Sequence, residues 1–265
     1  MKHIVNVSGG RASGVALFRV LERFPREEVY AGFADTRAES ADLYRFLDDL
    51  ERAAGIPIAR LSDGRDAWDV WFESFMFTTG LNGGCRASWE LKRKPLEAWR
   101  RTVASPEDAV VYIGYGMDEE ARVERLLKSD IIWTFDFPLR WKPHLGPCDL
   151  SDFLIQHGVK PAADYDKGYK HANCGGACIL AGIAQWCGLL KDDPLRFRAY
   201  EEKEQQFLAG LRERNRTEIT ILKDRRGGAV NNLSLKQLRE EIEAGIREPK
   251  DTWRLSTCSC TGLLF

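Results

Sequence analysis

The chain has 265 residues, of which 44% are hydrophobic, so it can bury a substantial core. This composition excludes disorder for most of the chain. Its 39 basic and 40 acidic side chains give a formal net charge of -1, which excludes a global field drawing it onto nucleic acid or an anionic membrane. Its first residues form too short an apolar run for a secretory signal, and it shows no apolar run of the roughly 18 residues that a membrane helix needs. We therefore expect a cytoplasmic protein without a membrane partner.

Strands and helices alternate in the first part of the chain. Residues 2–7 read as a buried strand, and residues 13–24 carry apolar side chains at helical spacing. A strand at 29–33, an amphipathic helix at 40–54 and a short strand at 58–61 follow. This order predicts a parallel sheet with right-handed crossovers, whose ligands bind beyond the carboxyl ends of the strands.

The later elements continue the alternation and then change character. Residues 66–104 are Trp-rich and helical in pattern, and residues 138–175 have the composition of functional loops. The remaining predicted elements are strands at 108–115, 131–135 and 219–222 and helices at 119–127 and 197–214.

The segment at residues 8–13, Ser-Gly-Gly-Arg-Ala-Ser, stands between the first strand and the first helix. Glycines let a backbone turn sharply and approach an anion, and the N–H groups that open a helix point at it. The segment therefore predicts a phosphate cradle, with a structural turn as the alternative. Its nucleotide-binding candidates are Ser8, Gly9, Gly10, Arg11 and Ser13.

Seven cysteines in a reducing compartment favour metal ligation, catalysis or burial over disulfides. Residues 173–178, Asn-Cys-Gly-Gly-Ala-Cys, place the thiols of Cys174 and Cys178 four positions apart with glycines between them. Thiolates of this kind bind Zn²⁺ and iron–sulfur centres. Cys258 and Cys260 near the end of the chain are candidate catalytic thiols, since a thiol on a flexible tail can attack a nucleotide or resolve a persulfide.

Segments in matching order resemble the PP-loop ATP pyrophosphatases and phosphoadenosine phosphosulfate (PAPS) reductases, the adenine nucleotide alpha hydrolases. Residues 8–13 are similar to the family's Ser-Gly-Gly-x-Asp-Ser, with Ala12 in place of Asp. Asp35 and Thr36, with Glu39 after them, resemble the Asp-Thr-Gly-x-Glu segment that lies beside the nucleotide. The resemblance adds Asp35 and Thr36 to the nucleotide-binding candidates.

Three further segments extend the resemblance to about residue 180. Cys85 followed by Lys92 is similar to a Cys and Arg-Lys of the reductases, and Gly114 with Arg122 is similar to their Gly-x-Arg-x-Asp-Glu-Ser-x-x-Arg element. Residues 165–174 resemble the reductase stretch that ends at a cysteine pair. Gly114 and Lys92 thereby become candidates for nucleotide binding, and Arg122 becomes a candidate for catalysis.

The resemblance implies an α/β fold, namely a three-layer parallel-sheet adenine nucleotide alpha hydrolase-like (Rossmann-like) domain over residues 1–180. A mostly helical extension with a cysteine-containing tail is predicted over residues 181–265. Adenosine phosphosulfate (APS) reductases bind a [4Fe-4S] cluster through an upstream cysteine pair and a downstream Cys-x-x-Cys, and Cys85 and Cys174 fall in matching places. The hypothesis is a [4Fe-4S] cluster, with a Zn²⁺ site or buried free thiols as the alternatives. Its proposed ligands are Cys85, Cys148, Cys174 and Cys178, with Cys148 chosen because its loop lies in the reductase-like stretch.

Three functions follow from the resemblance. A PAPS reductase-like oxidoreductase would pass the sulfonyl group of PAPS or APS to a cysteine, and would need a thioredoxin-like reductant. An ATP pyrophosphatase-type sulfurtransferase would adenylate a nucleic-acid base or a metabolite, with Mg²⁺ as a further candidate cofactor and a sulfur donor as partner. Ala12 stands where the family has Asp, and Gly116 stands where the reductase element has Arg. These two differences favour a third candidate, a non-catalytic nucleotide-sensing module. A nucleic-acid partner would need a local basic patch, drawn from residues 92–101 and 122–128.

Overall fold

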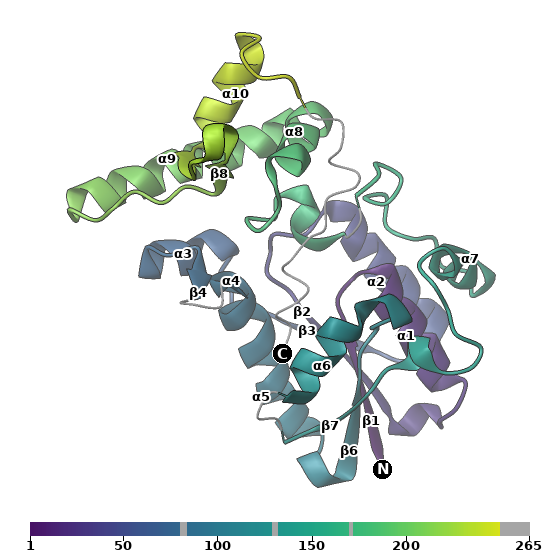
Figure 1. The fold of residues 1–265 in the computed structure, drawn as a ribbon. Coiled ribbons are helices and arrows are strands. Elements are labelled where there is room, and N and C mark those ends of the chain that lie inside the picture. Colours follow the sequence, from purple (N-terminus) through teal and green to yellow (C-terminus); the bar gives the residue numbers. More distant parts are fainter. Residues whose placement is uncertain (80–83, 129–131, 170–171, 250–265) are drawn as a thin grey trace.

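A five-stranded, fully parallel sheet forms the centre of the molecule, with the strand order β3-β2-β1-β6-β7. The computed structural model describes residues 1–79, 84–128, 132–169 and 172–249. The strands are β1 (Lys2–Val7), β2 (Val29–Ala34), β3 (Ile58–Leu61), β6 (Ala109–Tyr112) and β7 (Thr134–Asp136), and Figure 1 shows them at the centre of the lower part. The predicted parallel sheet is confirmed.

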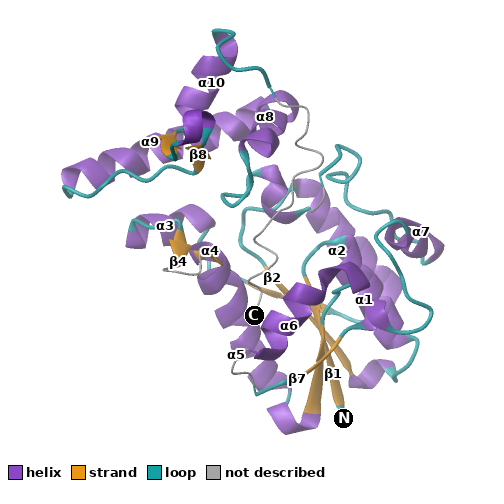
Figure 2. Ribbon diagram, in the orientation of Figure 1, coloured by secondary structure: helices purple, strands orange, loops and turns teal. Residues whose placement is uncertain are grey.

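Helices cover both faces of the sheet, because alternate side chains of each strand point to opposite faces. Val5 and Val7 of β1 pack with one buried cluster, whereas Ile4 packs with Val111 and Trp133 in another. The first face is covered by α1 (Arg11–Leu21), α2 (Ala41–Ala54) and α7 (Asp149–Gln156), and the second by α5 (Lys94–Val103) (Figure 2). The predicted three-layer α/β architecture is therefore confirmed.

The second helix shows how local sequence sets these layers. Its N-cap is Ser40, whose hydroxyl accepts a hydrogen bond from the backbone N–H of Leu43, and it ends at Gly55, whose φ of 66° suits glycine. Its buried side chains repeat at helical spacing and face the sheet. They are Leu43, Phe46, Leu47, Leu50 and Ala54.

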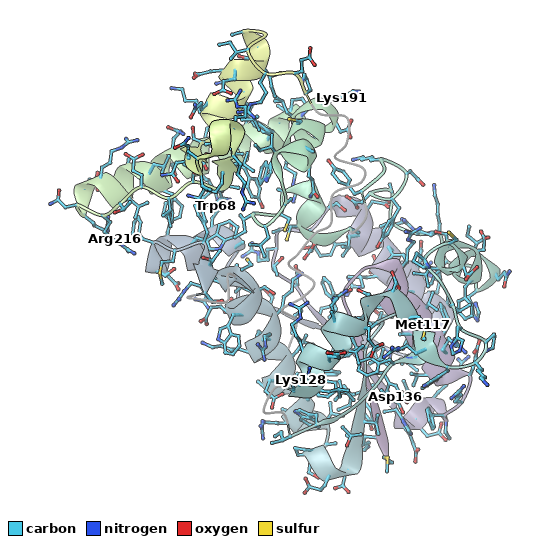
Figure 3. All side chains as sticks on the ribbon, viewed as in Figure 1. Trp68, Met117, Lys128, Asp136, Lys191 and Arg216 are labelled. Atoms are coloured by element: carbon cyan, nitrogen blue, oxygen red, sulfur yellow. The ribbon has the colours of Figure 1, made fainter. Side chains whose placement is uncertain are left out.

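The C-terminal part of the chain packs on the Trp-rich segment that precedes β6. It consists of helices α8 (Ile183–Asp192), α9 (Pro194–Glu213) and α10 (Leu235–Glu243), with the hairpin β8 (Leu222–Asp224) and β9 (Asn231–Leu233). Trp68 lies in α3 (Ala67–Ser74) and is labelled in Figure 3. Its ring is edge-on to that of Tyr200 in α9, with ring centroids 5.5 Å apart. One hydrophobic cluster thus joins both sides of residue 180. In the part of the chain that the structure describes, no helix has the length and apolarity to cross a membrane.

A buried carboxylate fastens this C-terminal packing. Glu204 of α9 is fully buried and accepts hydrogen bonds from the backbone N–H groups of Ile221, at 2.9 Å, and Leu235, at 2.6 Å. Burial raises the pKa of Glu204 to about 7, against the opposing effect of these two donors. The folded state therefore binds this proton more tightly than the unfolded chain does.

We expect the free energy of unfolding to fall as the pH rises from 5 to 8. A carboxyl whose pKa is raised by folding contributes stability that is complete below the unfolded pKa, near 4.5, and lost as the pH passes about 7. The difference is on the order of 3 kcal/mol for a shift of this size. Urea unfolding of the wild type and of Glu204→Gln at pH 5, 6, 7 and 8 measures it. The variant should lose most of this slope, and equal slopes in the two proteins would contradict the assignment.

Candidate functional site

The predicted phosphate loop lies at the carboxyl edge of the sheet, between β1 and α1. Gly9 has a φ of 78°, and a Cβ there would stand 2.7 Å from the side chain of Leu43, so only glycine fits. The Ser13 hydroxyl accepts from the Ser8 backbone N–H at 3.0 Å and donates to the Gly10 carbonyl at 2.9 Å. Ser8 and Ser13 thus hold the loop in shape, with their hydroxyls 3.2 Å apart.

The loop stands at the point where the strand order reverses. The chain runs from β1 outward to β3 on one side and returns to β6 on the other side of β1. Loops that leave such neighbouring strands diverge and open a crevice for ligands. Gly114 follows β6 and approaches the start of α1 so closely that a Cβ would stand 2.6 Å from the Ala12 backbone and 2.8 Å from the Ser13 nitrogen. Gly114 therefore positions the loop through backbone contact.

The segment after β2 links the phosphate-loop edge to a second group of residues. The carboxylate of Asp35 accepts from the Tyr44 hydroxyl at 2.7 Å and from the Arg37 backbone at 2.8 Å. The hydroxyl of Thr36 donates to the carboxylate of Glu39 at 3.1 Å. Burial, with the neighbouring Asp35 carboxylate, raises the pKa of Tyr44. Tyr44 therefore stays a donor that orients Asp35.

Glu39 is the junction of the site. Its side chain is fully buried and forms an ion pair with Lys92, N to O 3.1 Å, on the π-helical turn Trp89–Arg93. The other carboxylate oxygen accepts from the backbone N–H of Cys174 at 2.6 Å. A buried carboxylate needs such partners, and removing either would leave a charge or a donor unsatisfied in the interior. In the sequence, Glu39 was recognised as the last residue of the segment that resembles Asp-Thr-Gly-x-Glu, but no role was predicted for it. Its place in that segment was the signal that could have marked it as a site residue.

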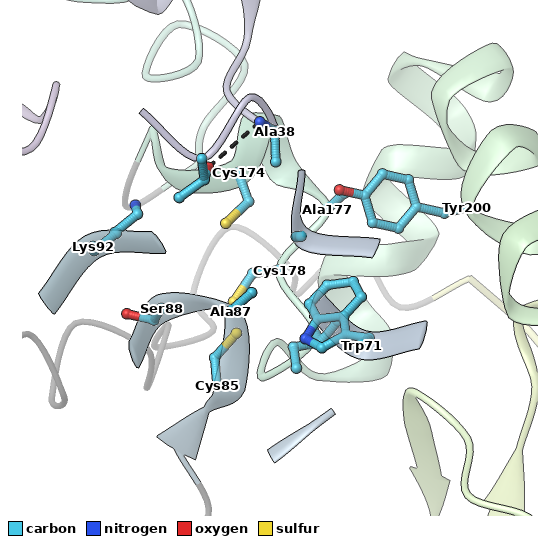
Figure 4. Close-up of a pocket in the computed structure, with 13 residues that line it drawn as sticks. Ala38, Trp71, Cys85, Ala87, Ser88, Lys92, Cys174, Ala177, Cys178 and Tyr200 are labelled. Atoms are coloured by element: carbon cyan, nitrogen blue, oxygen red, sulfur yellow. Dashed lines mark hydrogen bonds between the residues drawn. The ribbon is translucent and has the colours of Figure 1, made fainter. Parts of the chain in front are cut away.

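Three of the four predicted ligand cysteines line one pocket. Cys85 ends the short strand β5 (Gly84–Cys85), Cys174 lies in the 3-10 turn Asn173–Gly176, and Cys178 follows that turn. Figure 4 shows their sulfur atoms facing the same space, with Lys92 at its border. The pocket has an empty volume of about 520 Å³, counting space open to solvent, within the range of small-molecule sites.

The backbone of Cys174 adopts an unusual conformation that its neighbours maintain. Its φ of 54° lies in the left-handed region, which costs a residue other than glycine about 1 kcal/mol. Besides the contact to Glu39, the Cys174 carbonyl accepts from the guanidinium of Arg196 at 3.2 Å. Arg196 also donates to the carbonyl of Ala38 and covers Gly175, where a Cβ would stand 2.6 Å from its guanidinium. The loop is thus held from both the sheet and α9.

Two aromatic residues complete the pocket, and the sequence had assigned neither of them to a site. Trp71 of α3 and Tyr200 of α9 both line it (Figure 4). The indole N–H of Trp71 is buried and finds no hydrogen-bond acceptor within the described ranges. Burial raises the pKa of Tyr200, and the neighbouring Cys174 adds to this effect. Three thiols and an unsatisfied indole donor suit a ligand rich in sulfur or in oxygen acceptors.

Cys148, the fourth predicted ligand, does not line this pocket. Cys148 is exposed and immediately precedes α7, a helix that packs against α1. The pocket lies instead between the segment around Cys85, the Cys174 turn and α9. Cys187 is buried in the hydrophobic cluster, as expected for a core residue. Among the residues described, no three His, Cys, Asp or Glu side chains are arranged to hold a single metal ion.

Arg11 and Arg122, two further predicted residues, do not line the cysteine pocket. The guanidinium of Arg11 donates to the Ser151 hydroxyl at 2.8 Å, and that of Arg122 pairs with Glu119 and lies 4.0 Å from the Tyr115 ring centroid. Cys258 and Cys260 lie outside the described residues, and their catalytic role stays a prediction.

Sheet order and the helices on both faces together define a Rossmann-like α/β protein, a class whose ligands bind where the strand order reverses, here between β1 and β6. No protein-family model and no curated protein sequence matches the chain. Among solved structures, it is similar to a phosphoadenylyl-sulfate (PAPS) reductase from Candida auris in a phosphate complex. That comparison has a TM-score of 0.45 at 15% identity and covers 64% of this chain and 79% of the other.

Proposed function

We propose that the protein is a PAPS reductase-like enzyme that binds an adenine nucleotide at residues 8–13 and carries out sulfur chemistry at the cysteine pocket. The proposal rests on the contacts of Glu39. This residue contacts Thr36 of the nucleotide-side motif, Lys92 and the Cys174 backbone within one buried network. A nucleotide that contacts Thr36 or Lys92 would therefore act on groups that hold Cys174.

The residues divide the task by their chemistry. The loop offers backbone N–H groups at a helix start to negative phosphate oxygens. Lys92 adds a cationic point charge, which suits a sulfate or phosphate that reaches toward the thiols. Glu39 neutralises Lys92 while the site is empty and fixes the Cys174 turn. The apolar residues around the thiols limit water, which strengthens these electrostatic contacts.

In this proposal Cys85, Cys174 and Cys178 hold a [4Fe-4S] cluster, for which the three thiols and the buried Trp71 N–H are the support. Such a cluster would supply electron transfer or a sulfur-binding iron at the pocket. Iron analysis of alanine variants identifies the fourth ligand, and Cys258→Ala and Cys260→Ala are the first variants to examine. Zinc is the alternative occupant, because it is also bound by thiolates. The three thiols would have to draw together around it, since their described positions do not form a site for a single ion.

A second candidate is an ATP-dependent sulfurtransferase, in which ATP is cleaved between its α- and β-phosphates to activate an acceptor. The Ser-Gly-Gly loop serves ATP and PAPS equally and does not choose between them. This candidate is favoured by Gly116, which stands in place of the arginine of the reductase element. A nucleotide-sensing module without turnover is the third.

We expect the anaerobically purified protein to turn over one nucleotide and not the other. Incubation with ATP plus Mg²⁺ and, separately, with PAPS plus a dithiol reductant tests this through pyrophosphate and sulfite. Sulfite alone supports the reductase and pyrophosphate alone supports the sulfurtransferase. Nucleotide binding without either product supports the sensing module, and absence of binding to both nucleotides refutes the proposed site.

A further inference from the structure

The hydroxyl of Tyr165 stands at the start of α1, where the loop would present its N–H groups to an anion. It accepts a hydrogen bond from the backbone N–H of Arg11 at 3.1 Å. A Cβ added to Gly10 would lie 3.2 Å from the same oxygen, so the hydroxyl sits directly over the loop. The guanidinium of Arg11 lies 4.0 Å from the centroid of the Tyr165 ring, which keeps the ring in place.

Tyr165 belongs to a short segment that is fastened to the start of α2. The carboxylate of Asp164, next to it, accepts from the Ser40 hydroxyl at 2.6 Å, and the backbone N–H of Ala163 donates to Asp42 at 2.5 Å. Ser40 and Asp42 lie at the N-terminal end of α2, so the ring is presented to the loop from a fixed base.

The segment that carries Tyr165 is also linked to the Cys174 turn. Ser40, which donates to Asp164, follows Glu39 in the chain, and the Glu39 carboxylate accepts from the backbone N–H of Cys174 at 2.6 Å. Tyr165 and the Cys174 turn are therefore joined through Asp164, Ser40 and Glu39.

We propose that Tyr165 is an internal occupant of the phosphate position, which a nucleotide phosphate must displace, and that this exchange signals nucleotide binding to the Cys174 turn. The inference rests on the proposed nucleotide site. A phosphate oxygen and the Tyr165 oxygen compete for the same Arg11 N–H, because each would lie within about 3 Å of it. Displacement of the ring also moves Asp164 and, through Ser40 and Glu39, loosens the contact that holds the Cys174 N–H. Two sites that share one such element are coupled reciprocally.

The test compares Tyr165→Phe with the wild type in calorimetric titrations with ATP and with inorganic pyrophosphate. Phenylalanine keeps the ring under Arg11 and removes only the competing oxygen. We expect binding about 2- to 10-fold tighter, the net effect of one hydrogen bond. The matched control is Tyr30→Phe, whose hydroxyl contacts Lys2 at the opposite end of the sheet, and which should bind like the wild type.

The outcomes separate the two proposals. Unchanged or weaker binding by Tyr165→Phe, with normal binding by the wild type, overturns the role of Tyr165 and leaves the nucleotide site intact. Absence of binding in all proteins overturns the nucleotide site, and the role of Tyr165 with it.

A measurement on the wild type alone guards against a variant that fails to fold. Pyrophosphate should accelerate amide hydrogen exchange in the peptide that contains Cys174, whose N–H is held by Glu39. Exchange that pyrophosphate leaves unchanged or slows overturns the coupling.

Discussion

Replacing Cys174 with alanine is expected to reduce the iron content of the anaerobically purified protein to less than a quarter of the wild-type value. Its thiol shares the pocket with those of Cys85 and Cys178, and a cluster that loses one of its thiolates is poorly held. Cys85→Ala and Cys178→Ala should act in the same way. Because the free energy of metal binding is also free energy of folding, the melting temperature should fall together with the iron. Iron analysis, the visible absorption spectrum and thermal unfolding measure the three effects.

The matched control for these variants is Cys148→Ala. Cys148 is exposed beside α7 and does not line the pocket, so its removal should leave iron content and absorption unchanged. Loss of iron from Cys148→Ala would restore it as a ligand, contrary to its position in the structure. A wild-type protein that is colourless and contains zinc would contradict the cluster and support the zinc site.

The sheet could be predicted from the sequence because its signals are local. Each strand is a short apolar run followed by a helix with 3.6-residue spacing, and the parallel order follows from such units. The predicted boundaries of the strands were less accurate. The strand β7 covers Thr134–Asp136 rather than 131–135, and β8 covers Leu222–Asp224 rather than 219–222. The two-residue strands β4 (Thr78–Thr79) and β5 were missed, since two residues show no alternation.

The candidate site was predictable only where it follows a motif. Cys85, Cys174 and Cys178 came together as the resemblance implied, although 89 residues separate the first two (174 − 85). Trp71 and Tyr200 could not be assigned, because their place in the pocket depends on the packing of α3 against α9. No spacing rule in the sequence reports that contact.

Replacing Gly114 with alanine is expected to destabilise the protein by about 3 kcal/mol, the upper end of the cost of overpacking a well-packed interior. The new Cβ would stand 2.6 Å from the Ala12 carbonyl carbon and oxygen and 2.8 Å from the Ser13 nitrogen. These are backbone atoms, so no change of side-chain rotamer can relieve the contact. Either β6 or the first turn of α1 must move. For a chain of this size the melting temperature should fall by roughly 6–12 °C.

Gly146→Ala separates this effect from the general loss of a glycine. Its Cβ would meet only the Asp149 carboxylate, at an ordinary contact distance of 3.5 Å, and we expect a change in melting temperature of less than about 2 °C. Because the first turn of α1 carries the loop amides, Gly114→Ala should also weaken pyrophosphate binding in the fraction that stays folded, whereas Gly146→Ala should not. A Gly114→Ala protein with wild-type stability and affinity would show that the loop does not depend on the close approach of β6. The positions of the loop amides would then be set by α1 and β1 alone.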